Sequence, residues 1–414
     1  MKEFAHHRLA EIARTESAKV VARLARMLGD VDRAEEIAQE ALIVALEKWP
    51  ESGIPDNPGA WLMATAKHRA IDELRRARML RERHAEIARD EEGNVAPAAD
   101  ELPDDAVGDD LLRLFFVACH PMLARDAQVA LTLRLLGGLG IPEIARAFLA
   151  QETTIQQRIV RAKKALADAN VPFEVPTDLA PRLDAVLEVV YLVFNEGYAA
   201  TSGDDWMRPA LCHEAIRLGG VLVSLVPAEP EAHGLLALME IQASRAAART
   251  AADGEVVLLA DQDRTKWDRD RIARGLASLA RAEELGPRGP YAIQAAIGAC
   301  HARAASFAET DWARIVALYD ELLRIVPSPI VALNRAVAIG MARGPAAGLE
   351  AIDAIAGERA LMGYHLLPAA RADLLTKLGR RDEAREELER AATIAPSDRE
   401  RTLLLGRARA LGAS

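Results

Sequence analysis

The chain has 414 residues and a net charge of −10; half of its residues are hydrophobic and 4 % are aromatic. The length predicts two to four domains, and the wealth of Ala, Leu, Glu and Arg predicts an all-α protein. The acidic balance argues against indiscriminate nucleic-acid binding. With no apolar run of about 18 residues and no signal-peptide pattern, we expect a cytoplasmic protein without a membrane partner.

The charge is distributed unevenly along the chain. Residues 1–83 carry 15 Lys and Arg against 14 Asp and Glu, whereas residues 84–110 carry one Arg against ten acids. Residues 111–170 carry eight basic against four acidic side chains, and residues 171–414 carry 28 against 34. This order indicates two modules able to face DNA, an acidic linker between them, and a third module that does not contact DNA.

An amphipathic helix is predicted over residues 32–49. Asp32 followed by Glu35 three positions later is the pattern of a capping box at its start. We expect an apolar stripe that faces a core and an acidic outer surface. The stripe comprises Ile37, Ala38, Ala41, Leu42, Ala45 and Trp49, and the outer surface comprises Glu36, Gln39, Glu40 and Glu47.

A second helix follows a loop rich in Pro and Gly at residues 50–59. Asn57 is placed to cap this helix and Pro58 to occupy its first position, which both residue types favour. Residues 67–83 hold seven Lys and Arg against three acids, a composition suited to phosphate contacts. Trp61 has the spacing of a core residue rather than that of a platform for base stacking.

Residues 84–110 are acidic and interrupted by Pro and Gly, so we expect a flexible linker. A helix from Asp110 then leads into residues 140–167, which have the spacing of a helix-turn-helix. Ile144 and Ala145 belong to its first helix. Residues 150–154 form the turn, in which Thr153 or Thr154 is expected to cap the second helix.

The second helix of this motif separates an apolar face from a polar one. Ile155, Ile159, Ala162 and Leu166 recur at helical spacing and should face inward. The outward side chains can bond base edges and phosphates, as in a helix placed in a major groove. They are Thr154, Gln157, Arg158, Arg161 and Lys164. Taken alone, the pattern also fits a helical hairpin with a solvated basic face.

Three prolines within residues 170–181 mark another boundary, after which helices follow one another. Pro327 and Pro396 close two similar helices 69 residues apart, about twice the 34-residue period of tetratricopeptide repeats. Stacked helix pairs usually present a surface to a protein or peptide, so a partner of this kind is expected there. In the last unit we expect repeat positions at Ala372, Leu375, Ala384, Leu388, Ala391 and Pro396.

Two polar clusters in this part of the chain invite a catalytic or calcium-binding interpretation. They span residues 195–198 and 261–268, but the Gly and terminal Glu of a calcium loop are absent at the required positions. We expect helix caps and hydrogen bonds between repeats instead, with His233, His301 and His365 packed between helices.

The cysteines are isolated and odd in number, which indicates buried thiols in a reducing compartment rather than disulfides or a zinc site. They are Cys119, Cys212 and Cys300. We therefore expect no metal and no cofactor.

The combination of these elements resembles the extracytoplasmic-function (ECF) sigma factors of bacterial RNA polymerase, in the sigma-70 family. Residues 30–46 look like the region of this family that grips the polymerase clamp helices. Residues 58–76 look like its promoter −10 region, and residues 111–168 look like its promoter −35 domain. The rest is similar to a group of these factors with a tetratricopeptide-like extension; the matching stretches are 191–203, 258–275, 289–302, 331–338 and 363–380.

The resemblance implies sigma domain 2 at residues 1–83, a linker at 84–110, sigma domain 4 at 111–170 and a helical-repeat domain at 177–414. It implies a factor that is not an enzyme, binds core RNA polymerase and promoter DNA, and is regulated by its repeat domain. The residues expected to contact polymerase are Glu36, Gln39 and Glu40. Those expected at the −10 element are Asn57, Lys67, Arg69, Arg75 and Arg76, and those at the −35 element are Thr153, Thr154, Gln156, Gln157, Arg158, Arg161 and Lys164.

Two alternatives from other classes stay open. One is a helix-turn-helix regulator that uses the repeats as a peptide or protein sensor, although such a regulator has no need of the two helices within residues 32–76. The other is an enzyme with its site around residues 195–198, for which no complete catalytic constellation is present.

Overall fold

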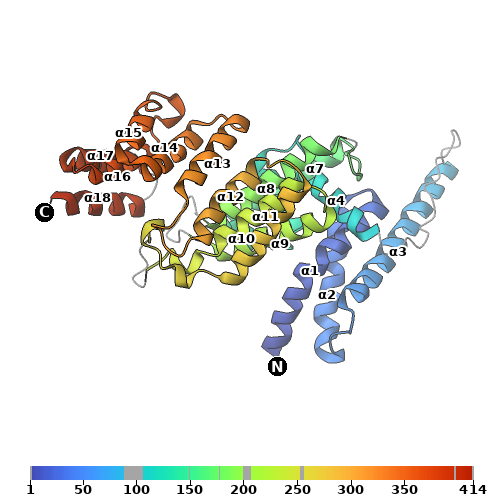
Figure 1. The fold of residues 1–414 in the computed structure, drawn as a ribbon. Helices are drawn as coiled ribbons and strands as arrows, with labels where there is room; N and C mark the ends of the chain where they lie inside the picture. The colour runs from blue at the N-terminus through green and yellow to red at the C-terminus, as the bar shows by residue number, and fades with distance from the viewer. Residues whose placement is uncertain are drawn as a thin grey trace. The chain divides into compact units, whose positions relative to one another are not determined.

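The computed structural model is built from helices throughout the residues that it describes (Figure 1). Within this described part, the isolated bridge between Thr250 and Val256 is the sole strand-like pairing, which confirms the all-α prediction. No helix in the same residues is long and apolar enough to cross a membrane. The described residues are 2–87, 106–148, 150–176, 178–198, 207–251, 256–395 and 398–412.

The chain divides into two compact units. Unit 1 comprises Met1–Gly197 and His213–Leu225, and unit 2 comprises Tyr198–Cys212 and Val226–Ser414. The helices that lie wholly or mostly in unit 1 are α1 (Lys2–Leu28), α2 (Val31–Ser52), α3 (Pro58–Ile87), α4 (Ala106–Ala118), α5 (Arg125–Leu135), α6 (Ile141–Ala147), α7 (Glu152–Asp168), α8 (Leu179–Tyr198) and α9 (Pro209–Leu225).

Helix α2 begins one residue before the expected capping position. Asp30 has extended backbone and its carboxylate accepts hydrogen bonds from the backbone N–H groups of Asp32 and Arg33, so Asp30 is the N-cap. The prediction that Asp32 caps the helix was wrong. The predicted apolar stripe is buried except for Leu42, which is half-buried.

The loop between α2 and α3 is shorter than expected because Pro50 lies inside the last turn of α2, which ends at Ser52. Gly53 follows with φ of +82°, a conformation that favours glycine. The Asn57 side chain accepts a hydrogen bond from the Ala60 N–H and caps α3, as predicted. Trp61 is half-buried and packs edge-on against the buried Trp49 at a centroid distance of 5.3 Å, a contact consistent with the predicted packing role.

Helices α4 to α7 form a second group in unit 1. Helix α4 starts at Ala106, four residues before the expected start at Asp110, and most of the predicted linker (88–105) lies outside the described residues. Gly138, with φ of +64°, makes the turn between α5 and α6. Ile144 and Ala145 are buried as expected.

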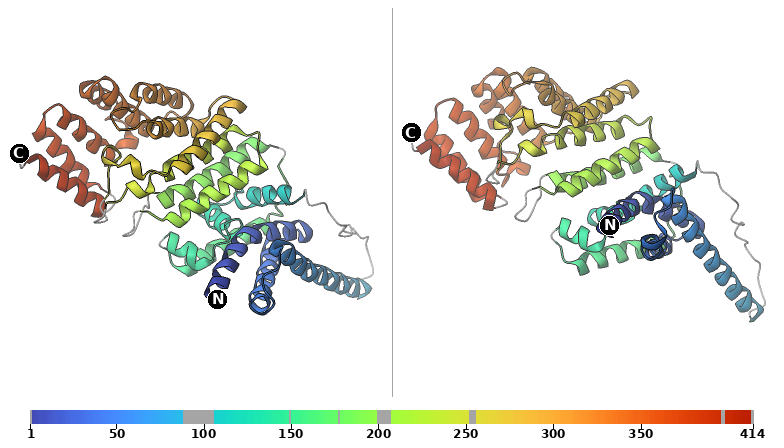
Figure 2. Two further views of the ribbon diagram at one scale, coloured as in Figure 1. Left: turned by 60° about the horizontal axis from the view of Figure 1, so that its bottom comes forward. Right: turned by 90° about the horizontal axis from the view of Figure 1, so that it is seen from below.

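Unit 2 is a series of helices that pack mainly on their neighbours in sequence. In Figure 2, α16, α17 and α18 lie side by side in both views. The helices of unit 2 are α10 (Pro230–Ala243), α11 (Arg269–Leu285), α12 (Pro290–Arg303), α13 (Trp312–Ile325), α14 (Pro329–Arg343), α15 (Pro345–Asp353), α16 (Leu366–Lys377), α17 (Arg381–Thr393) and α18 (Asp398–Gly412), with short 3-10 turns at Ala246–Ala248, Leu259–Asp261, Arg264–Lys266 and Arg359–Leu361.

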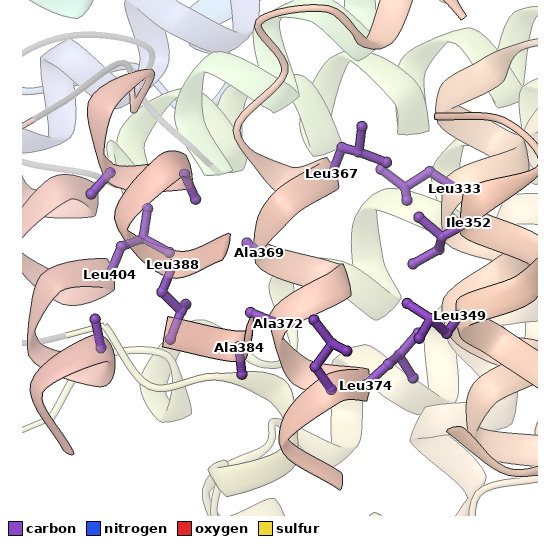
Figure 3. Close-up of a cluster of buried hydrophobic side chains, with 14 of the residues drawn as sticks. Leu333, Leu349, Ile352, Leu367, Ala369, Ala372, Leu374, Ala384, Leu388 and Leu404 are labelled. Carbon is purple, nitrogen blue, oxygen red and sulfur yellow. The ribbon is translucent and has the colours of Figure 1, made fainter. Parts of the chain in front are cut away.

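The last helix pairs confirm the repeat-like pattern. Ala372 and Leu375 on α16 and Leu388 on α17 are buried in one apolar cluster that extends from α14 to α18. Figure 3 shows Ala369 and Ala372 between the side chains of α14 and α15 and those of α17 and α18. Ala384 and Ala391 belong to the same cluster, whereas Pro396 lies outside the described residues.

Small residues bring α14 and α15 into close contact. A Cβ added at Gly348 would lie 2.6 Å from the Cα of Gly340, a distance that no real Cβ contact reaches. The two helices therefore need glycine at this crossing, because any larger residue would push the backbones apart.

Two of the three thiols are buried, as the sequence indicated. Cys119 and Cys212 are buried and Cys300 is half-buried, and none of these three cysteines forms a disulfide. Burial raises the pKa of Cys119 to about 12 and that of Cys212 to about 11. Both groups are therefore neutral thiols near pH 7 and poor nucleophiles.

Candidate nucleic-acid interface

Helix α7 presents the polar face that its sequence predicts. Within unit 1, the apolar side chains of Ile155, Ile159, Ala162 and Leu166 are all buried. The helix is amphipathic because these apolar residues recur every three to four positions, which leaves the intervening side chains on the opposite face. Of the predicted −35 set, Thr153, Thr154, Gln156, Gln157, Arg161 and Lys164 are exposed, and Arg158 is half-buried.

The start of α7 differs from the prediction. Its N-cap is Gln151, which makes no capping hydrogen bond through its side chain. Thr153 and Thr154 lie inside the first turn with exposed side chains. The prediction that either threonine caps the helix was wrong, and both hydroxyls are left available on the outer face.

Four of the outward side chains border one hollow on the surface of unit 1. Thr154, Gln157, Arg158 and Arg161 line a cavity of about 400 Å³ together with apolar residues from Met122 to Ala127 and from α7. Arg158 is held in place by Asp126 of α5, at 3.3 Å. The arrangement joins two cations and two neutral hydrogen-bonding groups, which is a set able to contact phosphates and base edges.

Lys163 points away from this face toward α2. Its Nζ lies 2.6 Å from an oxygen of Asp32 and 2.5 Å from Oε2 of Glu35, and its side chain is only 11 % exposed. Burial acts to lower the pKa of Lys163, but the charges of Glu35 and Asp32 outweigh it and raise that pKa above its usual value. The lysine is therefore cationic and committed to an internal contact.

Glu35 is the acceptor at the centre of this contact. It is buried and also pairs with Arg134 of α5, whose Nε lies 2.5 Å from Oε1. The expected capping-box role of Glu35 was wrong, because two cations from α5 and α7 draw its carboxylate inward. Sequence analysis missed Glu35, Arg134 and Lys163 as a group, since nothing local to any one of them indicates the other two.

A second buried carboxylate joins α4 to α1. Asp110 is completely buried and lies 3.3 Å from Arg23, 3.4 Å from Arg26 and 2.6 Å from Arg113. Three cations offset the cost of removing one carboxylate from water. Asp110 was assigned to the acidic linker, but it is a structural anchor of α4.

The predicted polymerase-binding residues lie on one surface of α2. Glu36 and Gln39 are exposed and Glu40 is half-buried. Each has an intramolecular partner: Glu36 pairs with Arg33, and the Gln39 amide donates to Glu35. Glu40 pairs with Arg69 of α3, so a residue predicted to contact polymerase binds one predicted to contact DNA.

The basic residues predicted at the −10 element are spread along α3. Arg69 and Arg75 are exposed and Lys67 is half-buried, while the side chain of Arg76 lies outside the described residues. Asn57 precedes them at the cap of the helix, with its carbonyl oxygen engaged by Ala60.

Helices beyond the predicted sigma-like modules also pack in unit 1. Arg182 of α8 donates to the carbonyl of Phe116 at 2.9 Å, and Arg217 of α9 donates to the carbonyl of Leu136 at 2.6 Å. Glu188 of α8 pairs with Arg125 of α5. The α4–α5 region that carries α7 is thereby connected to the start of the carboxy-terminal region.

The polar cluster at residues 261–268 has the structural role expected of it. The Asp263 and Asp268 carboxylates accept hydrogen bonds from backbone N–H groups at the starts of a 3-10 turn and of α11. Arg264 is buried and donates to the carbonyls of His301 and Ala304. In the described residues no group of His, Cys, Asp and Glu is arranged to hold a metal ion.

Three family models match the chain. Residues 12–79 match Sigma-70 region 2, and residues 116–166 match Sigma-70, region 4. Residues 182–283 match a family of unknown function, DUF6596. The first two matches contain α2, most of α3 and the helix-turn-helix.

Similar proteins fall into two groups. An uncharacterized protein of Rhizobium meliloti is 46 % identical over 90 % of this chain and 88 % of its own length. The ECF RNA polymerase sigma factor SigK of Mycobacterium ulcerans is 30 % identical over 36 % of this chain and 78 % of its own length. The probable ECF RNA polymerase sigma factor SigI of Mycobacterium tuberculosis is 28 % identical over 35 % of this chain and 50 % of its own length.

Proposed function

The chain belongs to the ECF sigma factors of the sigma-70 family, and we propose that α7 reads its promoter −35 element while α2 and α3 engage polymerase and the −10 element. The family consists of transcription initiation factors that bind core RNA polymerase and promoter DNA and are not enzymes. The residue roles and the role of the carboxy-terminal region are our proposals for this chain.

The single observation that carries the proposal is the division of α7 into two faces. Its four apolar residues fix the helix in unit 1, so the exposed set from Thr153 to Lys164 forms a rigid outer surface. Arg161 and Lys164 supply phosphate contacts, and the two glutamines and two threonines supply neutral donors and acceptors for base edges. Polymerase adds further DNA affinity, which agrees with the modest charge of this helix.

The assignments on α2 and α3 rest on charge and position. Glu36, Gln39 and Glu40 form an acidic surface suited to basic helices of the polymerase clamp. Lys67, Arg69, Arg75 and Arg76 form a basic series suited to phosphates near the −10 element, preceded by Asn57. The domain boundaries 1–83, 84–110, 111–170 and 177–414 belong to the same proposal.

We further propose that the carboxy-terminal region regulates promoter use. The support is physical connection: Arg182 and Arg217 hold α8 and α9 on backbone carbonyls of α4 and of the residue after α5. A change that reaches α8 or α9 would thus be transmitted to the group of helices that carries α7. A protein or peptide bound at the repeats is one such change.

In vitro transcription tests both parts of the proposal. Purified protein should direct core polymerase to start transcripts at a promoter that core alone ignores, and failure on every start site mapped after overexpression would contradict the sigma assignment. A chain ending at Leu225, which retains unit 1 together with residues 198–212, should initiate at a rate different from that of the full chain. Equal rates would remove the regulatory role and leave the sigma role intact.

A further inference from the structure

Unit 2 contains a cavity of about 320 Å³ among α10, α12, α13 and α14. Its volume lies at the lower end of the range for small-molecule sites in proteins. Apolar side chains, among them Ile241, Ile297 and Leu322, form much of its wall. The helix-turn-helix and the sigma-like surfaces contribute nothing to it, since all of its lining residues lie between 241 and 334.

The polar side chains of the wall are cationic or neutral. Arg245 and His301 line the cavity together with the amides of Gln242, Gln294 and Asn334 and the phenol of Tyr319. Among the described residues that line it, none is an Asp or a Glu. A cavity with one guanidinium, three amides and no carboxylate is complementary to an anion that carries further hydrogen-bonding groups.

Arg245 has no carboxylate within ion-pair distance in the described part of the chain. Its guanidinium donates to the Tyr198 hydroxyl at 2.7 Å and lies 5.9 Å from the ring centres of Tyr198 and Trp267. Its Nε is buried and makes no hydrogen bond. Arg245 is half-buried, and arginines withdrawn from water are ordinarily paired with an acid, so its positive charge is available to an anionic ligand.

A second cation, Arg264, binds the backbone of the lining residue His301 and has no acidic partner within ion-pair distance in the described residues. Arg264 is 7 % exposed and donates only to neutral groups, namely the carbonyls of His301 and Ala304 and the Thr310 hydroxyl. Its Nε likewise has no partner. Glu309 acts on it only at longer range. Two guanidinium groups therefore lie near the same Trp267 ring, and neither is within ion-pair distance of a carboxylate in the described residues.

His301 is affected by the same excess of positive charge. It is 9 % exposed, lines the cavity, and its Nδ1 is buried without a hydrogen-bond partner. Burial, followed by the charges of Arg245 and Arg264, lowers the pKa of His301 to about 4. The imidazole is thus neutral near pH 7 and adds no charge to the cavity wall.

We propose that this cavity binds a small organic acid, whose carboxylate pairs with Arg245 and whose apolar body contacts Ile241, Ile297 and Leu322. Arginine suits this role because its planar group can donate two parallel hydrogen bonds to one carboxylate. Gln242, Gln294 and Asn334 bond the remaining polar atoms of the ligand. The binding itself is independent of the proposed sigma function, whereas any effect of the acid on transcription rests on it.

The test is a titration of the full-length protein without polymerase or DNA. The probes are hexanoate and benzoate, with hexanamide and benzamide as neutral analogues and inorganic phosphate as a bare anion. Tryptophan fluorescence follows binding, because the Trp267 ring lies beside Arg245 and the Trp312 ring lies 5.2 Å from His301. Either carboxylate should bind saturably and at least about tenfold more tightly than its amide, the loss expected for one charge-assisted contact.

Variants assign the contact to this cavity. Arg245→Met should weaken carboxylate binding at least about tenfold, whereas Arg281→Met on the exposed surface of α11 should leave it unchanged. Gln294→Met, a conservative change at a half-buried position, should weaken binding severalfold without moving the thermal midpoint, which covers the case in which Arg245→Met fails to fold. The proposal is overturned if the amides bind as well as the acids, or if phosphate binds more tightly than either acid. It is also overturned if Gln294→Met binds unchanged, or if neither acid gives a saturable signal.

Discussion

The Nζ of Lys163 on α7 lies 2.5 Å from Oε2 of Glu35 on α2, although four helices separate α2 from α7 along the chain. The neighbouring Lys164 is exposed on the other side of the same helix. One turn of α7 thus carries two lysines with separate tasks, one internal and one facing outward. The pair offers a sharp test of the proposed interface.

Lys163→Met should lower the stability of the protein, and Lys164→Met should lower promoter use. Loss of Lys163 leaves Glu35 buried with Arg134 as its remaining partner, which we expect to cost about 2 kcal/mol. Loss of Lys164 removes one phosphate contact and should reduce the salt dependence of promoter binding by about one ion. Urea unfolding and DNA binding by the polymerase complex measure the two effects. A Lys164→Met protein that is as unstable as Lys163→Met would contradict the separation.

Asp110→Asn should destabilise unit 1 by about 3 kcal/mol, because it leaves Arg23, Arg26 and Arg113 around a neutral group at a fully buried position. Asp109 provides the matched control: it is the preceding residue and is exposed, so Asp109→Asn should change stability by less than about 0.5 kcal/mol. Chemical unfolding followed by circular dichroism compares the two. Equal, small effects would show that Asp110 is not the anchor of α4.

Arg161→Ala should reduce transcription from the cognate promoter about tenfold, the size expected for loss of one good contact to a base or phosphate. Affinity for core polymerase should not change, because Arg161 lines the hollow beside residues 122–127, whereas the proposed polymerase-binding residues lie on α2. Runoff transcription and a separate polymerase-binding assay distinguish the effects. Arg281→Ala, at an exposed arginine of unit 2, controls for the loss of one positive charge. Unaltered promoter output would exclude Arg161 from the −35 contact.

His301 should make the stability of unit 2 depend on pH. Its pKa in the folded protein is about 4, below the ordinary value of 6.5, so the unfolded chain takes up the proton first as the pH falls. The stability that the neutral imidazole contributes is full above pH 6.5 and is lost between pH 6.5 and 4. The loss by pH 4.5 is about 2–3 kcal/mol.

His301→Gln removes this titration while keeping a hydrogen-bonding side chain. The stability difference between wild type and the variant should therefore shift by about 2–3 kcal/mol in favour of the variant between pH 7.5 and 4.5. Urea unfolding at the two pH values, monitored by tryptophan fluorescence, provides the measurement. The same pH dependence in both proteins would mean that His301 is not the group responsible.

The parts of the fold that depend on local pattern could be predicted from the sequence. The inward residues of α7 and the repeat positions on α16 and α17 were identified correctly because helical spacing alone determines which residues share a face. The assignment of residues 261–268 to caps was correct for the same reason, since short Asp side chains next to a helix start have a local partner in the backbone.

Contacts between distant helices could not be predicted. Asp30 and Asp32 are both able to cap α2, and the spacing from Asp32 to Glu35 favoured the wrong one. Glu35 instead binds Arg134 and Lys163, and that choice depends on how α5 and α7 pack against α2. The buried position of Asp110 depends in the same way on α1. Whether the assigned DNA and polymerase residues act as proposed stays a prediction.

If Glu40 contacts polymerase and Arg69 contacts DNA, as we propose, the ion pair between them couples the two proposed binding surfaces. If polymerase takes up Glu40, Arg69 is released toward DNA, and DNA phosphates that take up Arg69 release Glu40 in turn; thermodynamic reciprocity requires the two effects to be equal. Both side chains are about two-fifths exposed, so the coupling is at most about 1 kcal/mol, or roughly fivefold in affinity. The free protein would then bind DNA more weakly than the protein bound to polymerase.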